Sequence, residues 1–350
     1  MSDNRIPSLN LGEFAADEAR RLKFLAELRT AARQVGFFYL VGHGVDPALP
    51  RELMHLARRF FALPEADKLA IEMVNSPHFR GYTRLAWERT RGEQDWREQI
   101  DVGAERAAVP QGPGVPAWTR LQGPNQWPAA LPELRDVVLR WQEAATAVLI
   151  RLMRAISVAL GQAPDALAAL YADEPHQLVK LIRYPGRHAT GGQQGVGAHK
   201  DADLLSLLLQ DEQSGLQVET AEGWVDVPPR AGTFVVNIGE LLEMASDGYL
   251  RATLHRVVTP PAGTERISAA FFLGARLDAV VPILDLPPEL AAQARGPERD
   301  PQNPLFRDVG RNQLKGRLRS HPDVARRHHA DLIDPETPAT ASGYQRCGPR

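Results

Sequence analysis

The chain has 350 residues, of which 43% are hydrophobic, which is enough for a well-buried core in one large domain or one with a substantial helical layer. Its 41 basic and 43 acidic residues give a formal charge of −2, so no overall field favours nucleic acid or an acidic membrane as a partner. The single Cys347 excludes internal disulfides and cysteine-based zinc or iron–sulfur sites, and the absence of a signal pattern or long apolar run predicts a cytoplasmic protein.

The first third of the chain predicts two helices around a short strand. Residues 12–35 carry apolar side chains at helical spacing and end at Gly36, which suits a helix C-terminus. Residues 37–41 predict a buried strand, and Asp46-Pro47 is typical of the start of a second helix. Between residues 75 and 132 the periodicity fades, and repeated prolines predict a long irregular connection.

Residues 132–160 show the longest helical pattern, with Gly161 at its end, and we interpret this helix as core packing. From residue 177 the pattern changes to short apolar runs separated by Gly and Pro. Many short strands of this kind indicate a double-sheet β-sandwich or jelly roll with helices packed outside it. The basic stretch from Arg317 to His329 predicts a solvated C-terminal helix over the barrel, and residues 331–350 predict a disordered tail.

One strand pattern carries candidate metal ligands. The run from Gly195 to Gln210 reads as a buried strand that opens with His199 and Asp201, and residues two apart in a strand project to the same face. His255 lies in another strand-like segment and supplies a third candidate. A His-x-Asp pair with a distant His is the pattern of the facial triad that binds iron(II) and leaves other coordination positions open.

A second pair predicts an anion site beside this metal. Arg266 and Ser268 are also two apart in a strand-like segment. A guanidinium group can hold a carboxylate through two parallel hydrogen bonds, and a neighbouring hydroxyl adds a third. We therefore expect an anion with a distal carboxylate next to the metal.

The ordered set of His199, Asp201, His255, Arg266 and Ser268 resembles the iron(II)- and 2-oxoglutarate-dependent oxygenases, in the branch similar to isopenicillin N synthase. Residues 5–10, 36–44 and 211–218 also resemble that branch, so the likeness runs from about residue 6 to about residue 276. It implies a mainly β protein with α-helices, in which a double-stranded β-helix (jelly roll) core over 177–278 carries the catalytic site. Flanking regions are then a scaffold over 1–130, a helical layer over 131–176 and a C-terminal helical extension over 279–330.

The resemblance also implies roles for further residues. A tyrosine in the setting of Tyr184 points to the cosubstrate or substrate carboxylate in related enzymes, and simple core packing is the alternative. The region around Tyr82, Arg84 and Trp96 approaches the mouth of the active site in such enzymes, so these residues and Phe272 are candidate substrate contacts. For Trp96 and the arginines, packing under a loop and plain solvation are the alternatives.

Iron(II), 2-oxoglutarate and oxygen are the cofactor and cosubstrates that the resemblance implies, and a small molecule is the expected substrate. The first function is oxidation of an unactivated C–H bond by hydroxylation, desaturation or cyclisation, with release of succinate and carbon dioxide. The stretch Leu181-Ile-Arg-Tyr-Pro resembles isopenicillin N synthase more than the plant-type relatives, so an iron oxidase that does not use 2-oxoglutarate is an alternative function. A ligand-binding barrel without catalytic activity is a further alternative. Amino acids, peptides and secondary metabolites all remain possible substrates.

Overall fold

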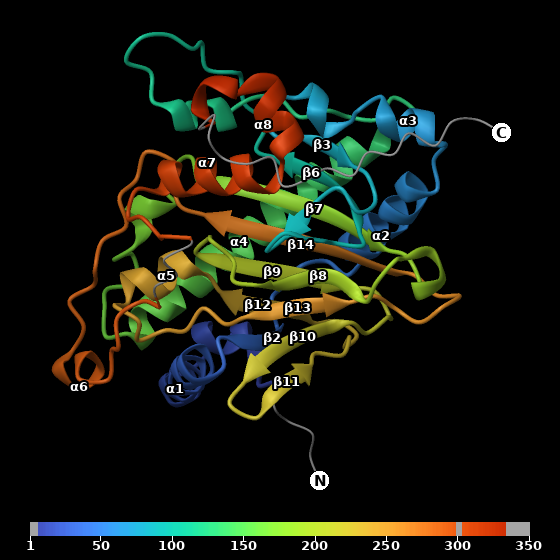
Figure 1. The fold of residues 1–350 in the computed structure, drawn as a ribbon. Coiled ribbons are helices and arrows are strands. Elements are labelled where there is room, and N and C mark those ends of the chain that lie inside the picture. Colours follow the sequence, from blue (N-terminus) through green and yellow to red (C-terminus); the bar gives the residue numbers. More distant parts are fainter. Residues whose placement is uncertain (1–5, 299–302, 334–350) are drawn as a thin grey trace.

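Two β-sheets face each other in the computed structural model, which describes residues 6–298 and 303–333 (Figure 1). In the described chain, the larger sheet has eight strands in the order β1-β2-β12-β9-β14-β7-β6-β3, and the smaller has the order β11-β10-β13-β8. All neighbours in both sheets are antiparallel except β1 and β2. The predicted double-sheet jelly roll is therefore confirmed.

The strands of the larger sheet are β1 Ser8–Asn10, β2 Phe37–Val41, β3 Gly81–Thr83, β6 Glu98–Gly103, β7 His176–Tyr184, β9 Leu205–Gln210, β12 Phe234–Ile238 and β14 Arg266–Gly274. Those of the smaller sheet are β8 Gln194–His199, β10 Leu216–Thr220, β11 Gly223–Asp226 and β13 His255–Val258, and a separate hairpin pairs β4 Arg89–Thr90 with β5 Glu93–Gln94. The α-helices are α1 Glu18–Gln34, α2 Ala48–Phe61, α3 Glu65–Leu69, α4 Glu133–Ala159, α5 Glu240–Ala245, α6 Pro288–Ala291, α7 Val309–Ser320 and α8 Pro322–His328. Short 3₁₀ turns cover η1 Leu11–Ala15, η2 Met73–Asn75, η3 Ala117–Leu121, η4 Ala168–Leu170, η5 Arg187–Ala189 and η6 Ala330–Leu332.

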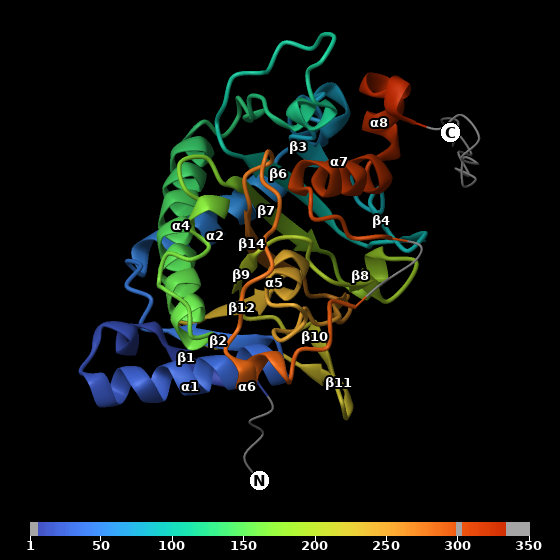
Figure 2. The same ribbon diagram turned by 90° about the vertical axis from the view of Figure 1, so that its left-hand side faces the viewer.

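The alternation of side chains along each strand divides the core into two layers. On β7, Val179 and Leu181 belong to the layer between the larger sheet and the helices, whereas Ile182 and Tyr184 belong to the layer between the two sheets. Figure 2 shows α4 along the helix-covered side of the larger sheet. Trp141 of α4 is fully buried there, with its ring against the edge of Phe234 on β12. We call the face of the larger sheet that looks towards the smaller sheet the interior face.

Helix α4 confirms the longest predicted helix and its end point. The helix stops at Ala159, and Gly161 follows with φ +74°, a conformation that side chains other than glycine rarely adopt. A Cβ at Gly161 would also lie 2.6 Å from the ring of Pro287, so the close approach of the following chain needs glycine as well.

The expected single strand from Gly195 to Gln210 is wrong, because the chain changes sheets within it. Strand β8 ends at His199 in the smaller sheet, and β9 begins at Leu205 in the larger sheet. Asp201 lies in the connection, where its backbone carbonyl accepts a hydrogen bond from the backbone N–H of Glu240 at the start of α5. Asp201 thus reaches the site from a turn rather than from a strand face.

Two further expectations need correction. The region 75–132, predicted to be irregular, contains β3 and β6. The sequence of β6 does not look like a buried strand because it carries Glu98 and Asp101, which are buried in ion pairs with Lys68 and Lys180. The basic C-terminal stretch is only partly solvated, because Arg317, His321 and His329 are buried, whereas Arg319, Arg326 and Arg327 are exposed. Of the predicted disordered tail, residues 334–350 lie outside the described residues.

Candidate metal and cosubstrate site

Three predicted ligands converge at the open end of the two sheets. His199 at the end of β8 and His255 at the start of β13 face each other in the register of the smaller sheet, with ring centroids 4.2 Å apart. The Nε2 atoms of both imidazoles lie 3.5 Å from Oδ1 of Asp201. One ligand atom from each of the three side chains falls within 4.8 Å of the others, and this is the only such His, Cys, Asp or Glu group of three found in the described part of the chain.

The carboxylate of Asp201 is held by its other oxygen. Ser206 Oγ donates a hydrogen bond of 2.6 Å to Asp201 Oδ2, and Asn237 Nδ2 donates one of 2.8 Å to the same atom. Both donors stand on the interior face, on β9 and β12. Because Oδ2 is occupied by these donors, Oδ1 remains directed at the two imidazoles.

The two imidazoles are oriented by backbone carbonyl groups. His199 Nδ1 lies 2.8 Å from Gly197 O, and His255 Nδ1 lies 3.1 Å from Thr253 O. A carbonyl accepts only from a protonated nitrogen, so this arrangement assigns the proton to Nδ1 and leaves the Nε2 lone pair facing the common centre. Burial, followed by the neighbouring His199, lowers the pKa of His255 to about 4, so its imidazole is neutral at pH 7.

The charge of Asp201 suits a cation at this centre. Burial alone would raise the pKa of its carboxyl, but the adjacent imidazoles and the Ser206 hydroxyl lower that pKa well below the usual range. Two imidazole nitrogen ligands and one carboxylate oxygen ligand on one side of the centre match the donor set of non-haem iron(II) sites. The side chains present therefore fit an iron(II) ion.

Arg266 and Ser268 lie together at the other end of the interior face, on β14. Arg266 is completely buried, its Nη1 lies 3.3 Å from Ser268 Oγ, and its Nη2 donates to Gln210 Oε1 at 2.9 Å. Its guanidinium carbon lies 5.1 Å from the centroid of the Tyr184 ring, opposite it on β7. The Nε of Arg266 is buried without a hydrogen-bond partner, so donor capacity remains for an anion.

The distance between the two ends suits a short dicarboxylate. In the register of β9 with β14, Ser206 lies opposite Phe272, and Ser206 is the residue that holds Asp201. Gln210, which accepts from Arg266, lies opposite Ser268. The two pairs are four positions apart along each strand, or about 13 Å of backbone, and Asp201 and Arg266 reach into this space from opposite ends. Gly215 keeps the Arg266 end open, because a Cβ there would lie 2.8 Å from Val258 O and 3.3 Å from Arg266 Cδ.

The predicted substrate contacts fall in different places. Phe272 lies on the interior face beside Ser206, and the ring of Trp96 lies beside Gly191 and Gly192, just before β8. Tyr82 and Arg84 are not brought to this face: the Tyr82 hydroxyl donates to Glu98 and the Arg84 guanidinium pairs with Glu72. Both line a separate cavity of about 440 Å³ with Lys68 and Trp87.

Several residues that shape the site carry only a weak signal in the sequence. Ser206 and Asn237 sit within apolar strands as isolated polar residues on the buried face, and that isolation was the available clue. Asp95 has no clue of this kind, although it is fully buried beside β8 and accepts a hydrogen bond from the backbone N–H of Gly197.

Comparison with known proteins agrees with this geometry. Residues 6–130 match the model of the non-haem dioxygenase in morphine synthesis N-terminal family, and residues 175–275 match that of the 2OG-Fe(II) oxygenase superfamily. Together with the site, these matches define a non-haem iron oxygenase.

The relatives narrow that class. The chain is 37% identical over 342 residues to the 2-oxoglutarate-dependent dioxygenase frbJ of Dothideomycetidae sp. (strain 11243), covering 93% of this chain and 92% of that protein. It is 35% identical to homoarginine-6-hydroxylase 2-ODD-C23.1 of Arabidopsis thaliana, covering 77% and 82%. The crystal structure of JOX2 in complex with 2OG, Fe and JA shows 25% identity and a TM-score of 0.69, covering 90% of this chain and 85% of that one.

The chain belongs to the iron(II)- and 2-oxoglutarate-dependent dioxygenases, enzymes that use iron(II), 2-oxoglutarate and oxygen. The alternative of an oxidase without 2-oxoglutarate is not favoured, because relatives across most of the chain are named for 2-oxoglutarate dependence. The narrower label of isopenicillin N synthase-like therefore fits only loosely. In the described residues, no helix is long and apolar enough to cross a membrane.

Proposed function

We propose that this dioxygenase hydroxylates an unactivated C–H bond of a small molecule and releases succinate and carbon dioxide. The observation that carries the proposal is the convergence of His199, Asp201 and His255 at one end of the interior face, with Arg266 and Ser268 at the other. We assign the first three to iron(II) and the last two to the distal carboxylate of 2-oxoglutarate. We place Tyr184, whose ring lies under the Arg266 guanidinium, at the same cosubstrate.

Bound iron(II) and 2-oxoglutarate would supply the oxidising chemistry, and the protein's part is to orient them and exclude water. Ser206 and Asn237 fix the Asp201 carboxylate, while Gly197 O and Thr253 O fix the two imidazoles. Arg266, which is wholly buried, sets the direction from which the cosubstrate approaches. The substrate carbon is then placed by side chains on the interior face, with Phe272 as a candidate.

We propose an amino acid as the substrate class. Homoarginine-6-hydroxylases from three plants are 34–36% identical to this chain across about three quarters of it, so basic amino acids are the first compounds to test. A barrel that only binds a ligand would have no need for three converging metal ligands. Their presence argues for catalytic turnover.

The test is succinate release coupled to oxygen uptake by the iron-loaded protein, with a panel of amino acids. We expect substrate-dependent succinate from the wild type and none from the His199→Ala variant. The Ser157→Ala variant, altered at a buried serine of α4 far from the site, should keep full activity. Equal succinate release by wild type and His199→Ala would reject the proposal.

A further inference from the structure

A cluster of buried charges lies beside the metal ligands and has no part in holding iron or 2-oxoglutarate. We call it the interior charge cluster. Its members are Glu88, Asp95, Arg97, Asp101, Lys180 and Arg317, all at most 8% exposed. Burying charges is costly, and apolar residues often replace buried ion pairs without loss of stability. The position of this cluster therefore calls for a functional explanation.

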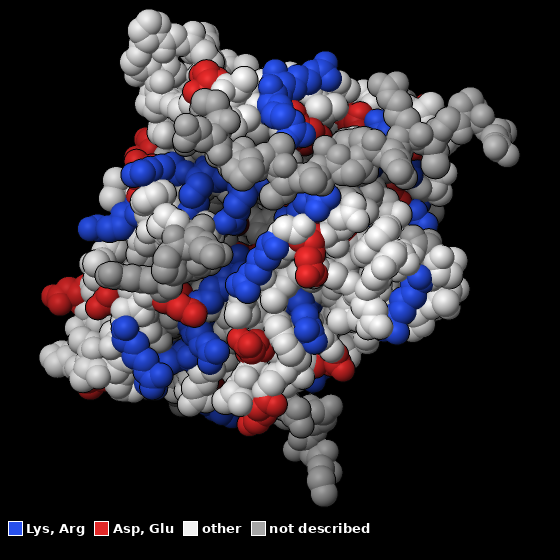
Figure 3. Space-filling view, viewed as in Figure 1, with Lys and Arg blue, Asp and Glu red and all other residues white. Residues whose placement is uncertain are grey.

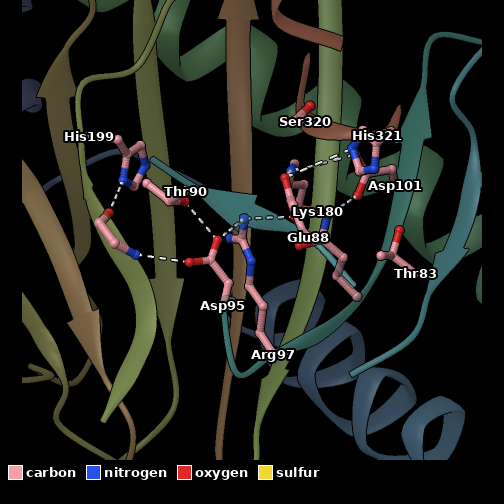
Figure 4. Close-up of polar contacts among 12 residues, drawn as sticks. Thr83, Glu88, Thr90, Asp95, Arg97, Asp101, Lys180, His199, Ser320 and His321 are labelled. Carbon is pink, nitrogen blue, oxygen red and sulfur yellow. Dashed lines mark hydrogen bonds and ion pairs between the residues drawn. The ribbon is translucent and has the colours of Figure 1, made fainter. Parts of the chain in front are cut away.

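The cluster faces the catalytic space. Asp101 and Lys180 pair across β6 and β7, and Lys180 shares the interior face of β7 with Tyr184. Arg97 is linked to the metal site through Asp95, whose Oδ1 accepts from the backbone N–H of Gly197, the residue whose carbonyl orients His199. Figure 4 shows Asp95 and Arg97 between His199 on one side and Glu88 with Lys180 on the other.

Most acceptor oxygens in the cluster are already engaged, and Glu88 Oε2 is the one that accepts no hydrogen bond. Asp95 accepts from the side chains of Thr90 and Gln194 as well as from Gly197. Both oxygens of Asp101 are used, Oδ1 by Gln99 and Oδ2 by Arg317 at 2.8 Å. Glu88 Oε1 accepts from Lys180 at 3.3 Å, and Glu88 Oε2 lies 2.7 Å from Arg97 Nη2 as an ion pair without a hydrogen bond.

The cationic donors have capacity left. The Nε of Arg97 is buried and has no hydrogen-bond partner. Lys180 has three donor hydrogens but only two acidic neighbours, Glu88 at 3.3 Å and Asp101 at 3.7 Å. An unpaired buried donor is costly, so a ligand that brings acceptor oxygens is favoured here. On the same strand as Asp101, Gln99 Oε1 is buried without a partner and can accept from an N–H group of the ligand.

The surface of the molecule is hollowed beside α7. Figure 3 shows Lys and Arg side chains gathered around this hollow. Positive charge around a surface hollow attracts anions and raises their local concentration.

We propose that Arg97 and Lys180 bind the carboxylate of the substrate, so that the enzyme acts on a carboxylate-bearing small molecule, an amino acid whose N–H group meets Gln99. This inference rests on the proposed function and names a subsite within it. It assigns the substrate carboxylate to Arg97, which directly precedes β6, and to Lys180 on β7, and it assigns the distal carboxylate of 2-oxoglutarate to Arg266 on β14.

The test compares binding of each L-amino acid with that of its carboxamide. The full-length protein is saturated with manganese(II) and 2-oxoglutarate, and binding is measured by isothermal titration calorimetry. Charge-assisted hydrogen bonds predict that the wild type binds at least one acid about 10-fold or more tighter than its amide. The analogue of that acid without its amino group should also bind more weakly than the acid.

Two matched pairs of variants locate the effect. Lys180 and Lys68 are equally buried, with side chains 11% exposed, and each pairs with a glutamate, but Lys68 lies on the helix-covered side of the sheet. Arg183 is the control for Arg97: it also binds a glutamate, Glu98, but on that same helix-covered side, and its side chain is 30% exposed against 9% for Arg97. Lys180→Met and Arg97→Gln should lose the preference for acid over amide, whereas Lys68→Met and Arg183→Gln should keep it.

The outcomes separate the subsite from the proposed function. If the wild type binds amides as tightly as acids, or binds no acid of the panel, the subsite is wrong even if Lys180→Met does not fold. The same holds if the control variants lose the preference equally. Acid-selective binding without succinate release would reject the proposed function and support the subsite. Succinate release without a preference for acids would support the proposed function and reject the subsite.

Discussion

Removing the Ser206 hydroxyl should weaken metal binding without disrupting the fold. Ser206 Oγ donates to Asp201 Oδ2 at 2.6 Å, and Asn237 gives that oxygen its second hydrogen bond. Loss of an outer partner of a metal ligand typically lowers metal affinity about 10- to 100-fold. Since Asn237 still holds the carboxylate in Ser206→Ala, we expect the lower end of that range, about 10-fold, and about 1–2 kcal/mol less stability.

The assay is anaerobic iron(II) titration by calorimetry, with thermal unfolding of the metal-free protein measured in parallel. Ser157→Ala is the matched control, because Ser157 is also a buried serine that donates one hydrogen bond, to the Met153 carbonyl of α4. This control should lose similar stability while keeping wild-type metal affinity. Unchanged iron affinity in Ser206→Ala, or an equal loss in both variants, would refute the role assigned to the hydroxyl.

Three further predictions follow from the same geometry. Arg266→Gln should raise the KM for 2-oxoglutarate roughly 100-fold, since about 3 kcal/mol of charge-assisted bonding is lost. Arg256→Gln, at a half-buried arginine of β13, should leave this KM unchanged. Gly215→Ala should weaken 2-oxoglutarate binding and cost about 1–3 kcal/mol in denaturant unfolding, because φ is +154° and the new Cβ meets Val258 O. Burial raises the pKa of Glu240 to about 7, so this carboxyl ionises at lower pH in the unfolded chain than in the folded one. The free energy of unfolding of the metal-free protein should therefore fall by roughly 3 kcal/mol from pH 4.5 to 7.5. A Glu240→Gln variant whose unfolding keeps the full wild-type pH dependence would contradict this.

The sequence predicted the fold class and the group at the metal centre because both depend on local spacing. His199, Asp201 and His255 were identifiable by residue type and order, and they do converge. The route by which Asp201 gets there was not predictable from period-two alternation, because the chain leaves one sheet at His199 and enters the other at Leu205. A change of sheet is fixed by long-range pairing, which no short window contains.

Strand β6 shows a second limit of prediction from the sequence. Glu98 and Asp101 would be read as solvent-facing residues of a loop, yet both are buried because Lys68, Lys180 and Arg317 compensate their charge. Those partners come from segments 30 to 216 positions away in the chain. Compensation over such separations is visible only in the folded molecule, and for that reason the sequence alone does not reveal the interior charge cluster.

The most direct test of the central claim is a crystal structure of the anaerobic protein with iron(II) and 2-oxoglutarate, with the metal located by its anomalous scattering. We expect one iron peak at bonding distance from Nε2 of His199, Nε2 of His255 and Oδ1 of Asp201, with the distal carboxylate of 2-oxoglutarate on Arg266 and Ser268. An iron peak bound by other residues, or 2-oxoglutarate held away from Arg266, would contradict the account.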